Sequence, residues 1–434
     1  MALHSFRMDR AGAASVIKLP NFRRFWVSAA FEGVGDTTAR TMFPLIAVSV
    51  LGASAFEVGL LNSLGLIAFL LVGLPTGVLV DRWRKRWIMI AASVLRALML
   101  LSLPVAFLVD VLALWQLLLV TALVGVADVF FTTAHSTALP RVVGDDLLSL
   151  AAARLHSAQS VIGMATPAVV GVMLRIVSAP AALLVSVASY LLSASSILRT
   201  RFSDSTTAPE APFWQETMAG IHFLVKERHL RALSLSSVLL NAGAMFGNAA
   251  TVIFALGQLG IDAATYAMLG TLGAAGALCG SFIAVPLLRI WGIGKSKIIV
   301  SATTPLILAA YPMAGNLPFF PELWVGISSF GWALAVVLHS VAGADVIPRL
   351  APPHMLGRVT AGYRFFIIGM MPLASVIGGA VASAYGPEIA LWGWALLALL
   401  SAAPIVCSPV CSWRAVPEEL QAPDSPSLHS PESK

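Results

Sequence analysis

The chain has 434 residues, of which 58% are hydrophobic and only 11% are charged, and its mean hydropathy is +0.87. Soluble domains carry about 25% charged residues, so this composition excludes an ordinary soluble protein and indicates a polytopic membrane protein. The net charge of +6 does not indicate nucleic-acid binding, because the cations lie in short stretches between apolar segments. The three cysteines show no metal-ligand spacing, and we expect no cofactor.

Apolar segments long enough to cross a bilayer recur from the first to the last part of the chain. The polar stretch 199–231 divides them into six and six, and its second part, from Trp214 to Arg231, predicts a surface helix. We therefore predict an all-α membrane protein with twelve transmembrane helices in two pseudo-symmetric six-helix halves. The predicted spans are about 25–50, 57–80, 87–109, 113–136, 151–175, 180–198, 232–256, 263–288, 297–315, 322–345, 358–384 and 387–409.

The positive charges predict the orientation of these spans. Nearly all of the 27 Lys and Arg residues fall on the side of the N-terminus; the exceptions are Arg175 in an opposite loop and Arg40 and Arg96 inside spans. Cytoplasmic loops are enriched in Lys and Arg, so we expect both termini in the cytoplasm. The predicted domains are a basic N-terminus (1–24), a first half (25–198), a linker (199–231), a second half (232–409) and a disordered tail (410–434).

The turn between the second and third spans carries the most specific motif in the chain. It reads Gly77-x-x-x-Asp81-Arg82-x-x-Lys85-Arg86 and lies between two apolar segments. This pattern resembles the signature of the major facilitator superfamily, and the likeness extends over about residues 20–405. The resemblance implies alternating access, in which two halves rock about a site near the middle of the membrane.

Other segments are similar to the drug- and siderophore-exporter branch of that superfamily. The resemblance includes Asn21-Phe22-Arg23-Arg24-Phe25-Trp26, Gly35-Asp36 and Leu95-Arg96-Ala97. The fifth span contains a degenerate antiporter-like motif, in which Thr166 and Val170 replace two glycines while Gly163, Pro167 and Gly171 remain.

The resemblance also implies a role for the acid of the turn motif. Asp81 would face the start of the eleventh span near Gly357 and Arg358, where the helix dipole and the arginine favour a carboxylate. The alternative is that the motif sets topology only. We expect Asp81→Asn to slow transport while membrane insertion stays normal, measured as initial transport rate against the amount of protein in the membrane. An unchanged rate would exclude the latch.

The first span carries Glu32, Asp36 and Arg40 at intervals of four residues, which places all three on one helix face. Ionisable side chains within a membrane are costly and mark transport pathways. Asp36 and Arg40 can pair along the helix, as a structural ion pair or as part of the pathway. Glu32 has no partner nearby in sequence; it is a candidate proton carrier or a wetted residue near the cytoplasmic end.

Asp128 in the fourth span is the next candidate for proton coupling, with Arg96 or Arg40 as its partner. A static ion pair is the alternative. His135 and His339, near the ends of spans four and ten, are further titratable groups.

Polar and aromatic residues within the spans are candidates for a substrate cavity, because ligand pockets combine apolar walls with a few polar groups. Ordinary packing is the alternative for each aromatic residue. The candidates are His156, Gln159, Asn241, Phe246, Asn248 and Trp332.

We expect a secondary transporter and not an enzyme, since the sequence lacks the phosphate-binding Gly-x-x-x-x-Gly-Lys-Ser/Thr loop. The predicted activity is proton antiport that exports a hydrophobic or amphiphilic drug or secondary metabolite. The expected partners are the small-molecule substrate, protons and the lipid bilayer, and we expect a monomer. The alternatives are a lipid or lysolipid flippase, an importer, or a membrane receptor or scaffold that transports nothing.

Overall fold

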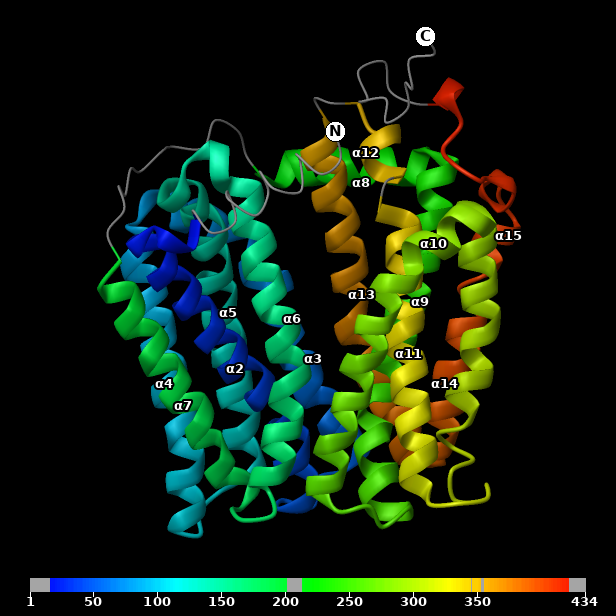
Figure 1. The fold of residues 1–434 in the computed structure, drawn as a ribbon. Coiled ribbons are helices and arrows are strands. Elements are labelled where there is room, and N and C mark those ends of the chain that lie inside the picture. Colours follow the sequence, from blue (N-terminus) through cyan, green and yellow to red (C-terminus); the bar gives the residue numbers. More distant parts are fainter. Residues whose placement is uncertain (1–15, 201–212, 345, 353–354, 421–434) are drawn as a thin grey trace. The chain divides into compact units, whose positions relative to one another are not determined.

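The structure is a computed structural model, and it describes residues 16–200, 213–344, 346–352 and 355–420. It is helical throughout these ranges (Figure 1). The long helices are α2 (Pro20–Ser49), α3 (Ala55–Arg82), α4 (Lys85–Leu108), α5 (Leu114–Val143), α6 (Leu148–Met173), α7 (Ala179–Leu198), α9 (Arg228–Ile253), α10 (Ala263–Ala309), α11 (Pro321–Ala344), α13 (Leu356–Tyr385) and α14 (Pro387–Leu400). The shorter helices are α8 (Phe213–Lys226), α12 (Val346–Leu350) and α15 (Ala403–Val406).

Among the described residues, nine helical segments are long and apolar enough to cross a membrane. The helix α10 combines the predicted eighth and ninth spans, and Gly292 interrupts it with a φ of 77°, a conformation that favours glycine. Two more helices of membrane-spanning length, α2 and α6, have a more polar composition. The arrangement is therefore consistent with the predicted twelve spans. The basic segment 1–15, the linker residues 201–212 and the tail residues 421–434 lie outside the described residues.

Local sequence signals explain where several helices begin. Ser54 and Glu57 form a capping box at the start of α3, in which each side chain binds the backbone N–H of the other. Asp262 precedes α10 and accepts hydrogen bonds from the backbone N–H and the hydroxyl of Thr265, at 2.9 and 2.6 Å. These hydrogen bonds hold the pKa of the Asp262 carboxyl below its ordinary value.

The chain divides into two compact units. The first contains residues 1–210 together with 249–274, and the second contains 211–248 and 275–434. In the first unit, α7 packs against α2 and α4, α5 packs against α3 and α4, and α6 packs against α2. This packing places part of α2 inside the unit, which explains how Glu32 on its charged face can be buried.

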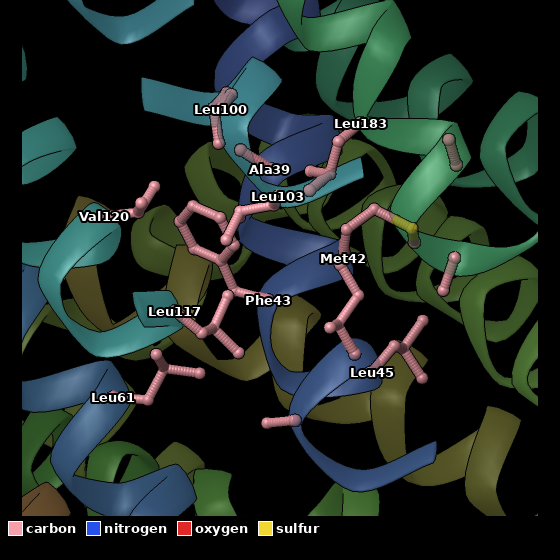
Figure 2. Close-up of a cluster of buried hydrophobic side chains, with 14 of the residues drawn as sticks. Ala39, Met42, Phe43, Leu45, Leu61, Leu100, Leu103, Leu117, Val120 and Leu183 are labelled. Atoms are coloured by element: carbon pink, nitrogen blue, oxygen red, sulfur yellow. The ribbon is translucent and has the colours of Figure 1, made fainter. Parts of the chain in front are cut away.

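A hydrophobic core fills the first unit (Figure 2). Met42, Leu45 and Leu61 are almost fully buried there, and so are Leu100 and Leu183. The cluster includes Val252 and Ala267, so the ends of α9 and α10 that belong to this unit pack on the same core. In a lipid bilayer, close packing of side chains rather than the hydrophobic effect holds helices together.

The second unit has its own core, and α8 is part of it. Leu224 of α8 is buried, and α8 packs against α13. A Cβ atom added at Gly220 would lie 2.0 Å from the carbonyl oxygen of Arg358, so only glycine allows this approach. A helix thus forms within the linker where a surface helix is predicted, but it ends at Lys226, and residues 228–231 belong to α9. This helix covers the first turns of α13.

Candidate functional site

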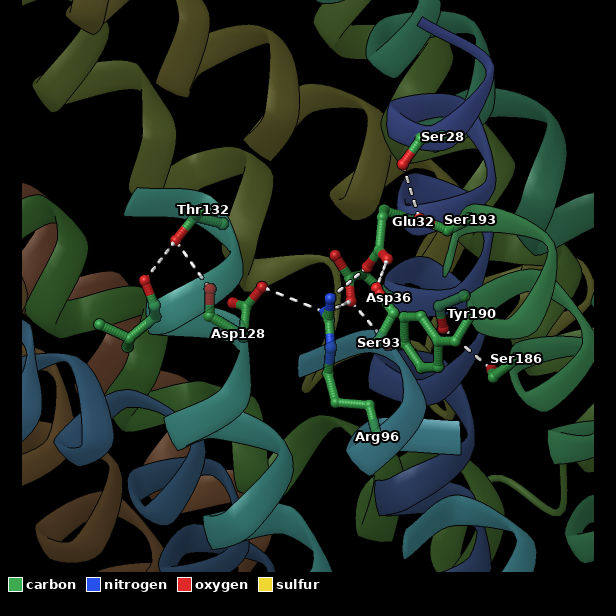
Figure 3. A network of polar contacts seen from close by, with 12 residues as sticks. Ser28, Glu32, Asp36, Ser93, Arg96, Asp128, Thr132, Ser186, Tyr190 and Ser193 are labelled. Atoms are coloured by element: carbon green, nitrogen blue, oxygen red, sulfur yellow. Dashed lines mark hydrogen bonds and ion pairs between the residues drawn. The ribbon is translucent and has the colours of Figure 1, made fainter. Parts of the chain in front are cut away.

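The centre of the candidate site is Arg96 on α4. Its side chain is fully buried and is surrounded by carboxylates from two other helices (Figure 3). Its Nη1 donates to Oδ1 of Asp36 at 3.1 Å and to Oδ1 of Asp128 at 3.4 Å, and its Nη2 donates to Glu32. A guanidinium offers several N–H donors in a fixed plane, so one arginine can bind several carboxylates at once.

Two aromatic rings enclose the guanidinium of Arg96. Its Cζ lies 4.4 Å from the ring centroid of Tyr190 and 5.0 Å from that of Phe131. Both distances are within the range in which a cation is attracted to the face of an aromatic ring. The rings exclude water from the guanidinium and restrict the directions in which its N–H groups can donate.

The carboxylates differ in how firmly they are held. Glu32 is bound by Arg96 and by the Ser93 hydroxyl, and only 5% of its side chain is exposed. Asp36 binds Arg96 and also accepts a 2.6 Å hydrogen bond from the Tyr190 hydroxyl. Asp128 has only longer contacts, at 3.4 Å to Arg96 and 3.8 Å to Arg40, and its side chain is 27% exposed, as is that of Asp36. Asp128 is therefore the most weakly held of the three.

This geometry changes the pairing inferred for the first span. Arg40 pairs with Asp128, whereas Asp36 pairs with Arg96 of another helix. The helix face is as predicted, but the neighbouring helices offer better-placed partners than the same helix does. Glu32 is buried rather than wetted, and its partner is also Arg96.

Sequence reasoning missed three polar side chains of α7 that line the cluster. Tyr190 binds Asp36, Ser193 lies 2.7 Å from the Ser28 hydroxyl, and Ser186 donates to the carbonyl of Gly35 at 2.9 Å. They are spaced by three or four residues, so they share one face of the helix. A polar stripe on an otherwise apolar span was the signal that could have indicated them.

Gly35 allows Tyr190 to lie against α2. A Cβ atom at this position would lie 2.8 Å from Cε1 of the Tyr190 ring, which is too close for any real contact. We expect Gly35→Ala to push the ring away, to weaken the hydrogen bond to Asp36, and to destabilise the protein by about 1–3 kcal/mol. Thermal unfolding of the purified protein measures this. Gly163→Ala is the matched control, since a Cβ there meets nothing within 4 Å; equal stability of the two variants would contradict the interpretation.

The charges of the cluster do not balance. Glu32, Asp36 and Asp128 contribute three negative charges when ionised, and Arg96 and Arg40 contribute two positive charges. Arg40 compensates poorly, because 76% of its side chain is exposed and its contact is 3.8 Å long. An excess carboxylate beside a buried ion pair favours uptake of one proton, since protonation removes repulsion between like charges.

The cations of the Asp81 turn bind helix ends. Lys85 is buried and its Nζ donates to the carbonyl of Val80 at 3.3 Å, and Arg86 donates to the carbonyl of Leu198 at the end of α7. Cations near the last carbonyls of a helix are favourable. Arg82 is exposed. The surroundings of Gly77 and the side chain of Asp81 lie outside the described part of the structure, so the latch formed by Asp81, Gly357 and Arg358 stays a prediction.

The antiporter-like motif of α6 packs against the first turns of α10. A Cβ atom at Gly171 would lie 2.3 Å from Cγ of Met268, and Pro167 lies against Gly270. These residues belong to the first unit. The glycine that the motif retains thus permits close packing of two helices in a membrane protein.

The cavity candidates fall in both units. His156 and Gln159 are exposed on α6 in the first unit. In the second, the ring of Phe246 lies against Gly393 of α14, where a Cβ would be 2.5 Å from Cε1, so this residue packs helices together. Trp332 stacks edge-on with Trp394 at 4.9 Å, Asn241 donates to the carbonyl of Ser237, and Asn248 is partly buried.

The histidines His135 and His339 take no part in the ion pairs that Arg96 forms. His135 stacks on Phe25 with ring centroids 4.1 Å apart. His339 is buried in the second unit, beside the buried Lys297, whose Nζ donates to the His339 carbonyl at 3.1 Å. Within the ranges that the structure covers, Lys297 forms no ion pair.

The helical fold and the buried charges on its spans define a secondary transporter of the major facilitator type. The family model described as transmembrane secretion effector matches residues 11–432. The chain therefore belongs to this family of multi-pass membrane transporters, and the alternative of a receptor or scaffold is set aside.

Several proteins of known name are similar to this chain. Macrolide efflux protein A of Streptococcus pyogenes is 23% identical over 361 residues, which cover 82% of this chain and 87% of the relative. Macrolide efflux protein A of Enterococcus faecalis is 24% identical, and the match covers 73% of this chain and 97% of that protein.

Crystal structures show the same fold at low sequence identity. A mutant of the nucleoside transporter NupG has a TM-score of 0.73 and 13% identity, covering 89% of this chain and 99% of that chain. A bacterial homologue of the iron transporter ferroportin, in an inward-facing state, has a TM-score of 0.71 and 13% identity, covering 90% of this chain and 98% of the homologue. The predicted major facilitator fold is confirmed.

Proposed function

We propose that this protein exports a hydrophobic or amphiphilic small molecule of the macrolide type and couples export to proton entry. The family and the two macrolide efflux relatives support export. The observation that carries the coupling is the grouping of three carboxylates around one buried arginine, Arg96. The proposed location is a bacterial inner membrane with both termini in the cytoplasm, and the proposed functional form is a monomer.

Asp128 is the proposed site of proton exchange within the cluster. The group that takes up a proton must be reached by water and must lose little when its charge is removed. Asp128 is more exposed than Glu32, at 27% against 5% of the side chain, and Asp36 is as exposed as Asp128. The contacts of Asp128 with Arg96 and Arg40 are longer than that of Asp36 with Arg96, so Asp128 loses less when its charge is removed.

Glu32 and Asp36 have a different role in this proposal. They hold Arg96 in place, with support from Ser93 and Tyr190. When Asp128 is protonated, its attraction to Arg96 and Arg40 weakens, and α5 is less firmly bound to α2 and α4. Coupling requires that cargo binding bias the same contact as the proton.

Transport in proteoliposomes tests this function. Purified protein is reconstituted, a pH gradient is imposed, and accumulation of erythromycin, as a macrolide, and ethidium, as a lipophilic cation, is measured. The proposal requires accumulation that collapses when a protonophore removes the gradient. Accumulation that persists without any proton gradient would exclude proton coupling, and the absence of both accumulation and exchange of every probe would exclude drug export.

A further inference from the structure

A groove outside the charged cluster lies on the surface of the first unit between α4 and α5. Its volume is about 460 Å³, and its walls are almost entirely apolar. The residues that matter for its chemistry are Trp83, Arg84, Trp87, Ala91, Leu95 and Phe130. The groove begins at the turn that carries the Asp81 motif and continues along the helices.

The charge of the groove is confined to one end. Among the described residues that line it, only Arg84 is charged, and no described carboxylate pairs with this guanidinium. Trp83 and Trp87 stand beside it with 56% and 54% of their surfaces exposed. Exposed tryptophans next to a cation are typical of the level at which lipid headgroups meet the hydrocarbon core.

The apolar part of the groove has the depth of one lipid leaflet. From Arg84 to Leu95 a helix rises by about 16 Å, which is about half of the 30 Å thickness of a hydrocarbon core. Farther along, Leu98, Leu101 and Val105 are exposed on the same helix, so the apolar surface continues. An acyl chain that begins near Arg84 would therefore remain on apolar surface over its whole length.

We propose that this groove binds one anionic phospholipid. Its phosphate lies against the Arg84 guanidinium, its headgroup region lies between Trp83 and Trp87, and an acyl chain follows the groove past Ala91 to Leu95. An exposed guanidinium favours a phosphate with net negative charge and repels a cationic amphiphile. The positive charge at this turn also matches the negative surface of the cytoplasmic leaflet, where the charge distribution of the chain places it.

Native mass spectrometry of the delipidated full-length protein tests the proposal. Phosphatidylglycerol and phosphatidylcholine with the same acyl chains are titrated separately. We expect tighter binding of phosphatidylglycerol, about fivefold weaker binding of it by Arg84→Gln, and little change in phosphatidylcholine binding by that variant. Ala91→Phe fills the groove and should weaken binding of both lipids.

Arg289→Gln is the matched control. Arg289 is an exposed arginine in the corresponding turn of the other half, so the variant removes the same charge without touching the groove. Equal affinity of the wild type for the two lipids would overturn the proposal, and so would equal effects of Arg84→Gln and Arg289→Gln. A dimer that Ala91→Phe dissociates, without any lipid effect, would show that a second copy occupies the groove and would also overturn it.

Discussion

Arg96→Met is expected to abolish transport and to destabilise the protein by about 3–5 kcal/mol. The substitution keeps an apolar side chain of similar length but removes the charge that binds Glu32, Asp36 and Asp128. Glu32 is buried, so losing its partner leaves an uncompensated carboxylate in a poorly hydrated place. Thermal unfolding of the purified protein in detergent and transport in proteoliposomes measure the two effects.

Arg40→Met is the control for Arg96→Met. It removes the same charged group, but its side chain is largely exposed and has one contact of 3.8 Å. We expect its effect on stability to stay within about 1 kcal/mol. The double variant Arg96→Met with Glu32→Gln should recover part of the lost stability, because it removes the unpaired buried charge. Equal stability of Arg96→Met and Arg40→Met would show that the buried ion pairs of Arg96 do not stabilise the fold.

Asp128→Asn is expected to uncouple transport from the proton gradient. The amide keeps the shape of the side chain but can neither take up nor release a proton at neutral pH. Accumulation driven by a pH gradient should fall at least tenfold, while exchange of substrate across the membrane without a gradient continues. Asp110→Asn is the matched control, since Asp110 is an exposed loop acid whose φ of 54° asparagine tolerates. Loss of exchange as well as accumulation in Asp128→Asn would indicate a binding or folding defect instead.

The sequence predicted the helices well, because each crosses a membrane and must satisfy its backbone hydrogen bonds internally. The positions and lengths of the apolar segments therefore predicted most of the membrane helices to within a few residues of their ends. The predicted eighth and ninth spans are both present in α10, but they meet at a kink at Gly292 instead of being joined by the loop expected over 289–296. The amphipathic pattern of α8 did not reveal that Leu224 is buried against the second unit's core. Such contacts depend on tertiary packing, which periodicity does not contain.

The charged residues of the site were also predictable, but their partners were not. A spacing of four residues placed Glu32, Asp36 and Arg40 on one face, and burial of charge in a membrane marked Arg96 and Asp128 as important. The choice of partner depends on how neighbouring helices are rotated. That rotation follows from small contacts such as Gly35 against Tyr190, which a single sequence does not reveal.

Substrate-induced proton release tests the central claim most directly. Erythromycin or ethidium is added to the purified protein in weakly buffered detergent solution near neutral pH, and a pH-sensitive dye records released protons. The account predicts proton release by the wild type and by Asp110→Asn, and no release by Asp128→Asn, although that variant still binds the compound by equilibrium dialysis. Equal release by Asp128→Asn and the wild type would contradict the assignment of the exchanged proton to Asp128.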